Sequence, residues 1–100
     1  MEQVVHFCNI LKTVTSKQRL NILSHINKKQ ASLVRQIAYN ILINKDIDLS
    51  ENERKYLRRH LISIRELASR KIHVDRKILI LVKKHLVFKK LCIIILKYLS

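Results

Sequence analysis

The chain of 100 residues contains neither glycine nor proline. A chain of this length would ordinarily hold about seven glycines and five prolines. Tight hairpins, sheet bulges and left-handed turns depend on glycine, asparagine or proline, whereas helices joined by short polar connections need neither glycine nor proline. The absence therefore predicts an all-α fold, built as a small bundle of four to five helices.

The length suits one small domain with a modest core. A hydrophobic content of 48% argues against a wholly disordered basic tail, which would lack the apolar surface needed to offset chain entropy. We expect residues 1–74 to form a helical bundle domain. Residues 75–100 are expected to form a basic and apolar C-terminal helix that packs on this domain or on a partner. The first residues lack a positively charged region and a cleavage site, so no signal peptide is predicted.

Apolar residues recur at helical intervals over roughly 3–14, 16–27 and 30–44, which predicts three helices. Thr15 or Ser16 is expected to cap the second of them. The basic residues of that second helix, Lys17 and Arg19, are expected to face water.

A fourth helix is predicted to begin within a residue or two of Glu51, because Ser50 and Glu53 have the spacing of a capping box. Its two sides differ in character. One side carries Tyr56, Leu57, His60, Leu61, Ile64, Leu67 and Ala68, and the other carries Arg54, Lys55, Arg58, Arg59, Arg65 and Arg70. The apolar side is expected to cover the core, which leaves the basic side for a partner.

The last segment is predicted to run as one helix from an N-cap at Asp75 to Leu99. On such a helix, basic residues spaced seven apart form one ridge, which consists of Arg76, Lys83, Lys90 and Lys97. Lys77 and Lys84 widen this ridge. Its apolar runs are far shorter than the roughly 20 residues needed to span a bilayer. Two alternatives stay open: buried strands, because β-branched residues are dense here, and a cationic helix lying in a membrane interface.

Positive charge is concentrated in the second half of the chain. Of the formal net charge of +14, residues 50–100 supply +10. A field of this kind attracts polyanions such as nucleic acid or an anionic membrane. The alternative is a charged surface that serves solubility alone.

No pattern of catalytic or metal-ligating residues is present, so we expect a protein that is not an enzyme and binds no metal or cofactor. The five histidines and two cysteines lack ligand spacing. Cys8 and Cys92 stand in apolar surroundings and are interpreted as buried structural thiols. The acids Glu51, Glu53 and Asp75 suit helix starts, where the helix dipole favours negative charge.

The basic residues favour contacts with phosphates over the recognition of bases. The chain has no tryptophan and only three tyrosines, so it offers few aromatic side chains on which bases could stack. The predicted nucleic-acid-binding residues are Arg54, Lys55, Arg58, Arg59, Arg65, Arg70, Lys71, Arg76, Lys83, Lys84 and Lys90.

Two stretches, "SKQRLNILSH" and "LVRQIAYNILINKDIDLSENERKYLRRHLISIRELASRK", resemble small basic proteins of Polinton/Maverick-type elements and adintoviruses. The similarity covers roughly residues 16–71. The matching positions are Leu49, Ser50, Arg54, Leu57, Arg58, Arg59, Ile64, Leu67, Ala68, Arg70 and Lys71. Between the basic block and the apolar tail, those relatives commonly carry Gly-Gly where this chain has 72–74. The resemblance implies a virion-associated basic protein comparable in role to a DNA-core protein, located in the virion or the host nucleus.

Together these observations predict a sequence-independent nucleic-acid-binding protein of the packaging or core type from a virus-like element. Two hypotheses from other classes stay open. One is a membrane-active or capsid-docking helical protein, whose partner would be an anionic membrane or a capsid protein. The other is a helical protein-interaction module, and a homo-oligomer is compatible with each of these functions.

Overall fold

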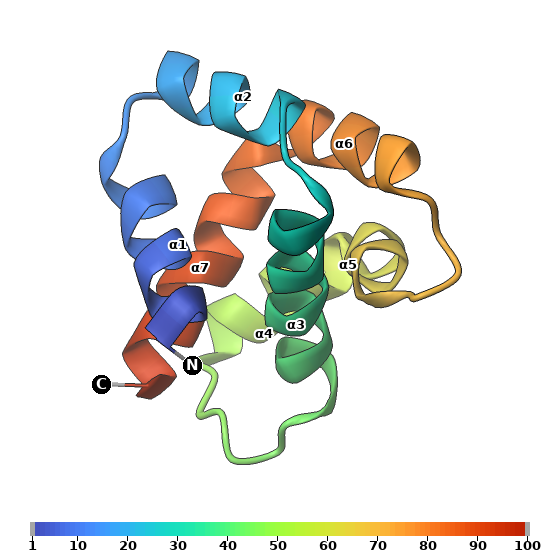
Figure 1. Cartoon of the computed structure of the whole chain (residues 1–100). Coiled ribbons are helices and arrows are strands. Elements are labelled where there is room, and N and C mark those ends of the chain that lie inside the picture. The colour runs from blue at the N-terminus through green and yellow to red at the C-terminus, as the bar shows by residue number, and fades with distance from the viewer. Residues whose placement is uncertain (1, 100) are drawn as a thin grey trace.

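The computed structural model describes residues 2–99, and every regular element in that range is an α-helix (Figure 1). The helices are α1 (Glu2–Thr13), α2 (Ser16–Ser24), α3 (Lys28–Ile43), α4 (Glu51–Arg59), α5 (Leu61–Ala68), α6 (Val74–Lys83) and α7 (His85–Leu99). The all-α prediction is confirmed. The predicted count of four to five helices is wrong, because each of the two long basic helices is broken into two.

Both breaks occur at single residues. The fourth predicted helix is interrupted at His60, where φ is −114° and ψ is 17°. The last one is interrupted at Lys84, where φ is −120° and ψ is 41°, so the expected long C-terminal helix does not exist. Tertiary packing explains the breaks, because α6 packs on α2 whereas α7 packs on α1, and α5 packs on α3. A straight helix could not reach these separate partners.

Side-chain caps define where several helices begin. Capping boxes open α2, α3 and α4, with the pairs Thr15 and Gln18, Asn27 and Gln30, and Ser50 and Glu53. The predicted caps at Thr15 and Ser50 are therefore confirmed. The predicted cap at Asp75 is wrong, because His73 occupies that position and its ring Nδ1 accepts from the backbone N–H of Asp75. Residues 2–99 contain no positive φ and no cis peptide bond, so the connections never need glycine or proline.

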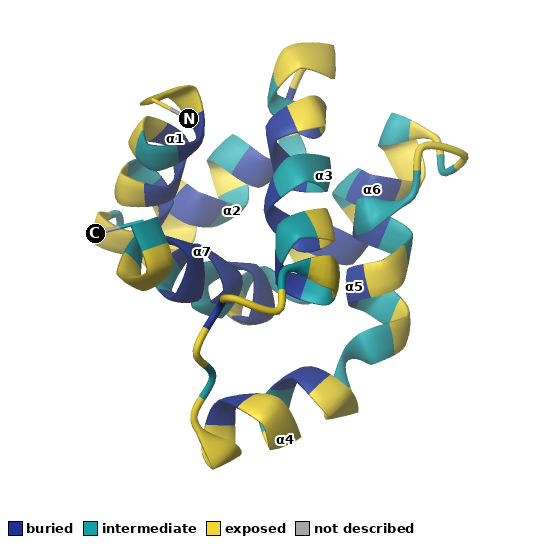
Figure 2. Ribbon diagram, turned by 90° about the horizontal axis from the view of Figure 1, so that it is seen from below, coloured by how far each residue is buried: buried dark blue, intermediate teal, exposed yellow. Residues whose placement is uncertain are grey.

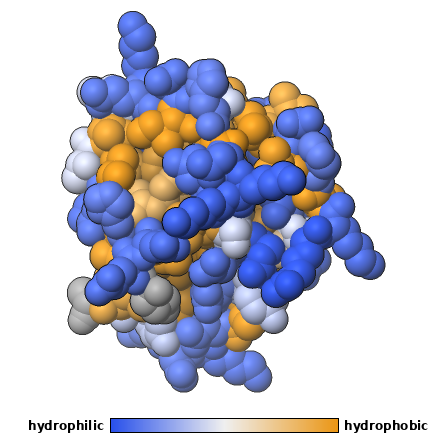
Figure 3. Space-filling view, viewed as in Figure 1, coloured by the Kyte–Doolittle hydropathy of each residue, from blue (hydrophilic) through white to orange (hydrophobic). Residues whose placement is uncertain are grey.

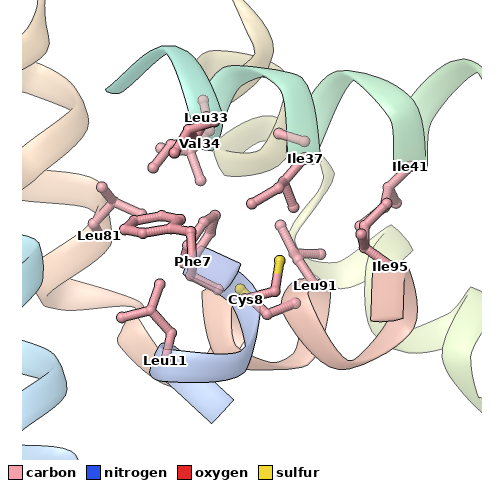
Figure 4. Packing of buried hydrophobic residues seen from close by; sticks show 14 of the residues in the cluster. Phe7, Cys8, Leu11, Leu33, Val34, Ile37, Ile41, Leu81, Leu91 and Ile95 are labelled. Carbon is pink, nitrogen blue, oxygen red and sulfur yellow. The ribbon is translucent and has the colours of Figure 1, made fainter. Parts of the chain in front are cut away.

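One hydrophobic cluster joins all seven helices. Its centre is α7, which lies beside α1 and α3 (Figures 1 and 4). Phe7 of α1 faces Phe88 of α7 with ring centroids 6.4 Å apart. Cys8 and Cys92 are fully buried and form no disulfide, as expected for structural thiols. Burial raises the pKa of the Cys92 thiol well above its ordinary value, and the adjacent Cys8 thiol adds to the effect.

The helix that is least embedded in this core is α4. Of its nine residues only Glu53 and Leu57 are buried, and its outer side is exposed along its length (Figure 2). This exposure follows from its composition, since Leu57 is its only buried apolar residue and Tyr56 is half-buried against the core. Polar contacts with neighbouring helices add to this limited apolar anchoring.

The largest fully buried side chain is that of Arg19, which is only 1% exposed. Its Nε donates to the carbonyl oxygen of Leu11 at 2.9 Å and its Nη2 to that of Val14 at 3.1 Å. Its Nη1 lies 3.5 Å from Nδ1 of His85. The guanidinium therefore closes the C-terminal end of α1, where free carbonyls and the helix dipole favour a cation. The expectation that Arg19 faces water is wrong.

Replacing Arg19 by Met should lower the free energy of unfolding by roughly 2–4 kcal/mol, because the buried carbonyl of Leu11 and the partly buried carbonyl of Val14 lose their donor. Arg19→Lys should recover only part of the loss, since an ammonium cannot reproduce the planar fork. Chemical denaturation followed by circular dichroism measures the change. Lys17→Gln, an exposed cation on the same helix, is the control and should stay within about 0.5 kcal/mol of the parent. Equal stability of Arg19→Met and the parent would contradict this role.

Candidate functional site

The two helix breaks face each other. Lys84 Nζ donates to Nδ1 of His60 at 3.4 Å, so the junction between α4 and α5 touches the junction between α6 and α7. On one side of this contact Lys97 donates to both carboxylate oxygens of Glu53 at 3.0 Å. On the other side Arg76 Nε donates to Glu66 at 3.0 Å. These three contacts pair the two broken helices in antiparallel order.

Cations gather along this line of contact. We call this group of cations the basic seam. Its six residues are Arg59, Arg76, Lys83, Lys84, Lys90 and Lys97. Arg76, Lys83 and Lys84 surround a hollow of about 230 Å³ together with Ser63 of α5. Lys90 and Lys97 line a second hollow of about 440 Å³ with Asn52, Glu53 and Tyr56 of α4. The six seam residues come from α4, α6, α7 and the junction at Lys84, and Ser63 of α5 lies beside them.

The predicted basic ridge does not form as a single line on one helix, because the break at Lys84 divides it between α6 and α7. Lys77, which was expected to widen the ridge, is only 5% exposed and lies inside the fold. Burial, with Arg35 nearby, lowers the pKa of Lys77. The seam nevertheless collects Arg76, Lys83, Lys84 and Lys90, because α4 and α5 lie alongside the two parts of the broken helix.

The predicted basic face of the fourth helix is also divided. Lys55 and Arg59 lie on the outer side of α4, and Arg59 is close enough to lower the pKa of His60. Arg54 and Arg58 lie on a different edge, over a hollow formed with α3 and α5. Arg65 is exposed on α5, beyond the break. Arg70 and Lys71 are exposed in the turn between α5 and α6. The eleven predicted residues therefore occupy several surfaces.

Most cations in the described chain have no anionic partner. Within residues 2–99, Arg76 and Lys97 are the only Lys or Arg side chains that form an ion pair with a carboxylate. The two acids of the seam, Glu53 and Glu66, are already engaged by these cations. Arg59, Lys83, Lys84 and Lys90 therefore present positive charge that the protein itself does not neutralise.

Titratable groups of the seam respond to this environment. The pKa of His60 is lowered by burial first, and then by the charges of Lys84 and Arg59. The pKa of Glu53 is lowered chiefly by the backbone N–H of Ser50, with Lys97 contributing. Burial raises the pKa of Tyr56, whose ring lies 5.0 Å from that of His60. At neutral pH the seam thus combines a neutral imidazole, a neutral phenol and an ionised carboxylate with the surrounding cations.

Sequence reasoning assigned His60 and Tyr56 to the core face and did not include them in the site. Both are half-buried at its edge, where α4 meets Lys84 and Lys90. Their positions on the margin of the predicted apolar face are the signal that could have located them. No signal of this kind marked Ser63 or Asn52, because their role depends on which helix lies opposite.

Among residues 2–99, no group of three or more His, Cys, Asp or Glu side chains is placed to hold a metal ion. In the same range no helix has both the length and the apolar character needed to cross a membrane.

The pH dependence of stability should report on His60 and Glu53. The pKa of His60 is lowered in the folded state. As pH falls below about 6.5, the ordinary histidine pKa, His60 is therefore protonated in the unfolded chain while it is still neutral in the folded chain. Stability should therefore fall as pH decreases from about 6.5 towards the folded pKa. Glu53 contributes stability that is present above its unfolded value of about 4.3 and is lost as pH falls through its lower folded pKa.

Urea denaturation between pH 8 and pH 3 measures both effects. His60→Gln should flatten the upper part of the decline, near pH 6, and leave the more acidic part in place. Glu53→Gln should reduce stability at pH 7 and flatten the acidic part. An unchanged pH profile in His60→Gln would contradict the lowering of the His60 pKa by burial and by the neighbouring cations.

Comparison of the chain with family models, curated protein sequences and solved structures finds no match.

Proposed function

We propose that the protein binds nucleic acid without sequence preference, through phosphate contacts made by the basic seam and the outer side of α4. The observation that carries the proposal is the seam's set of cations without carboxylate partners, namely Arg59, Lys83, Lys84 and Lys90. Their like charges repel each other in the free protein, and a phosphate backbone placed between them would remove that repulsion. Binding would then also stabilise the fold by mass action.

Several features favour phosphate contacts over base recognition. The cations come from different helices and from a junction, so no single helix offers a row of base-reading side chains for a groove. The aromatic side chain at the seam, Tyr56, is half-buried against His60 and is poorly placed to stack on bases. Lys and Arg neutralise phosphates of any sequence.

The finer proposal is a packaging or core role in a virus-like element. Its support is the sequence resemblance to small basic proteins of Polinton/Maverick-type elements and adintoviruses. A protein with this role would be found with the packaged genome, in the virion or the host nucleus. Duplex DNA is the natural first probe for this role.

Duplex DNA binding should be measured by fluorescence anisotropy at several salt concentrations. If about five phosphates are neutralised, log K should fall against log salt with a slope near −4 to −5. Arg59→Gln combined with Lys83→Gln should make that slope shallower by about two and weaken unrelated sequences alike. Both side chains are exposed and form no ion pair, so the helical content should be preserved.

The matched control is Lys28→Gln combined with Lys29→Gln, which removes the same charge at the exposed start of α3. This pair should leave the slope unchanged. Equal effects of the two double variants would show that binding depends on net charge alone. This result would contradict the proposal that the basic seam makes the phosphate contacts. The absence of any DNA binding at low salt would contradict the proposed function itself.

A second candidate function is binding to an anionic membrane surface, and one observation favours it. Leu79 of α6 is 64% exposed and lines the same hollow as Arg76, Lys83 and Lys84, and Leu86 of α7 is 58% exposed. Apolar surface among hydrophilic side chains is visible over α6 in Figure 3. Exposed leucines beside lysines are typical of a helix that lies in a membrane interface.

Vesicle sedimentation distinguishes this candidate. Binding to vesicles containing phosphatidylserine, absent with phosphatidylcholine alone and reduced at least tenfold by Leu79→Gln combined with Leu86→Gln, would support the membrane function. The same variant should leave DNA binding unchanged if the nucleic-acid function is correct. Retained vesicle binding in the variant would contradict a membrane role for these leucines.

A further inference from the structure

The hollow beneath Arg54 and Arg58 lies on the edge of α4 opposite its contacts with α7. It has a volume of about 240 Å³ and lies between the end of α3, the connection to α4, and the α4–α5 junction. Its lining residues are Ile41, Leu42, Leu49, Leu57, Leu61 and Ile64, together with Arg54 and Arg58. Apart from the two arginines, every lining side chain is aliphatic. We call this recess the α4 pocket.

The way in which α4 is attached explains why the pocket exists. Contacts with α7 hold one edge of the helix, through Glu53 and His60. The opposite edge carries Arg54 and Arg58 and forms no hydrogen bond or ion pair with α3 or α5. Leu57 reaches the core between these edges. The polar contacts thus hold α4 along one edge only, and the hollow lies beneath its other edge.

The depth of the pocket is graded. Ile41, Leu57 and Ile64 are buried and form its floor. Leu42, Leu49 and Leu61 are half-buried and form its walls. An apolar group that entered would cover these leucines and remove their exposed surface from water, which is favourable at about 25 cal/mol per Å².

The two arginines place positive charge at the mouth of the pocket. Arg54 and Arg58 are four residues apart on α4, so their side chains are neighbours along one edge. Like charges at this spacing weaken a helix slightly. Both side chains are exposed and neither has a carboxylate partner. No carboxylate of residues 2–99 neutralises this pair, whereas an anion at the mouth of the pocket could accept hydrogen bonds from both guanidinium groups.

We propose that the α4 pocket binds a single-chain carboxylate amphiphile, with its alkyl chain against the leucines and its carboxylate between Arg54 and Arg58. The hollow is open to solvent, so an alkyl chain would lie along its six aliphatic side chains with one flank in water. An alkyl chain suits the all-aliphatic lining, which offers no hydrogen-bonding group below the mouth. This site is separate from the basic seam and goes beyond the proposed nucleic-acid function.

The proposal is tested with decanoate as the probe and the full chain labelled at its Leu and Ile methyl groups. Decanoate should cause saturable shifts in the NMR signals of Leu42, Leu49 and Leu61. 1-Decanol should bind at least tenfold more weakly, because it lacks the charge that the arginines recognise. Acetate at equal concentration should cause no shifts in these methyl signals, since it has no chain to bury.

Variants separate the head-group contact from the pocket. Arg54→Gln combined with Arg58→Gln should weaken decanoate at least tenfold and leave 1-decanol unchanged. The control Lys28→Gln combined with Lys29→Gln removes the same charge at the start of α3, whereas the pocket lies at the end of this helix. This control should keep the decanoate affinity within about twofold of the parent. Leu61→Asn should weaken both decanoate and 1-decanol if the chain occupies the pocket.

Three results would overturn the proposal. They are equal binding of decanoate and 1-decanol, unchanged decanoate binding in the arginine variant, and shifts confined to exposed leucines elsewhere, such as Leu79 and Leu86. The titration contains no nucleic acid, so its outcome is independent of the outcome of the DNA experiment.

Discussion

The burial of Arg19 is the interaction on which the arrangement of the helices depends. A buried cation costs several kcal/mol unless hydrogen bonds and favourable dipoles compensate for its lost hydration. Here the compensation comes from the carbonyl groups of Leu11 and Val14 at the end of α1 and from the ring of His85. No carboxylate takes part. Because one planar group must satisfy all three acceptors, α2 has to cross the end of α1 at the point where α7 begins.

This constraint extends to the basic seam. His85 follows directly after Lys84, so the contact with Arg19 helps to fix the position at which α6 and α7 separate. Lys84 is then turned towards His60, and the broken helix pair becomes the line along which cations gather. A contact inside the fold thus determines the geometry of a surface that the proposed function uses. The α4 pocket has the same origin, because contacts along the seam hold α4 by one edge.

A net charge of +14 with few ion pairs has a consequence for stability. Self-repulsion of this size favours the unfolded chain. The fold opposes it with a single core to which every helix contributes, including Leu23 of α2 and Leu57 of α4. Four cations of the seam and the Arg54 and Arg58 pair are among those that have no carboxylate partner within residues 2–99. These are also the places where the proposals put an anionic partner.

Sequence patterns located the helix starts well because caps are local. The side chain of Ser50 needs only the backbone three residues later, and the same holds for Thr15, so neither depends on the rest of the fold. Periodicity was less reliable for exposure. Arg19 and Lys77 occupy positions that look polar on their own helices, yet both are buried in the fold. Periodicity describes one helix, whereas burial depends on every helix around it.

The sequence by itself determined the all-helical class, the capped beginnings of α2 and α4, the burial of Cys8 and Cys92, and the excess of positive charge in the second half. These properties follow from local backbone preferences, apolar surroundings and composition. Only the tertiary structure decided that His60 and Lys84 break two helices, that Arg54 and Arg58 lie apart from Lys55 and Arg59, and that Lys77 is buried. The physical reason is that each of these outcomes depends on which helix packs against which, and a continuous helical pattern contains no information about where its neighbours will lie.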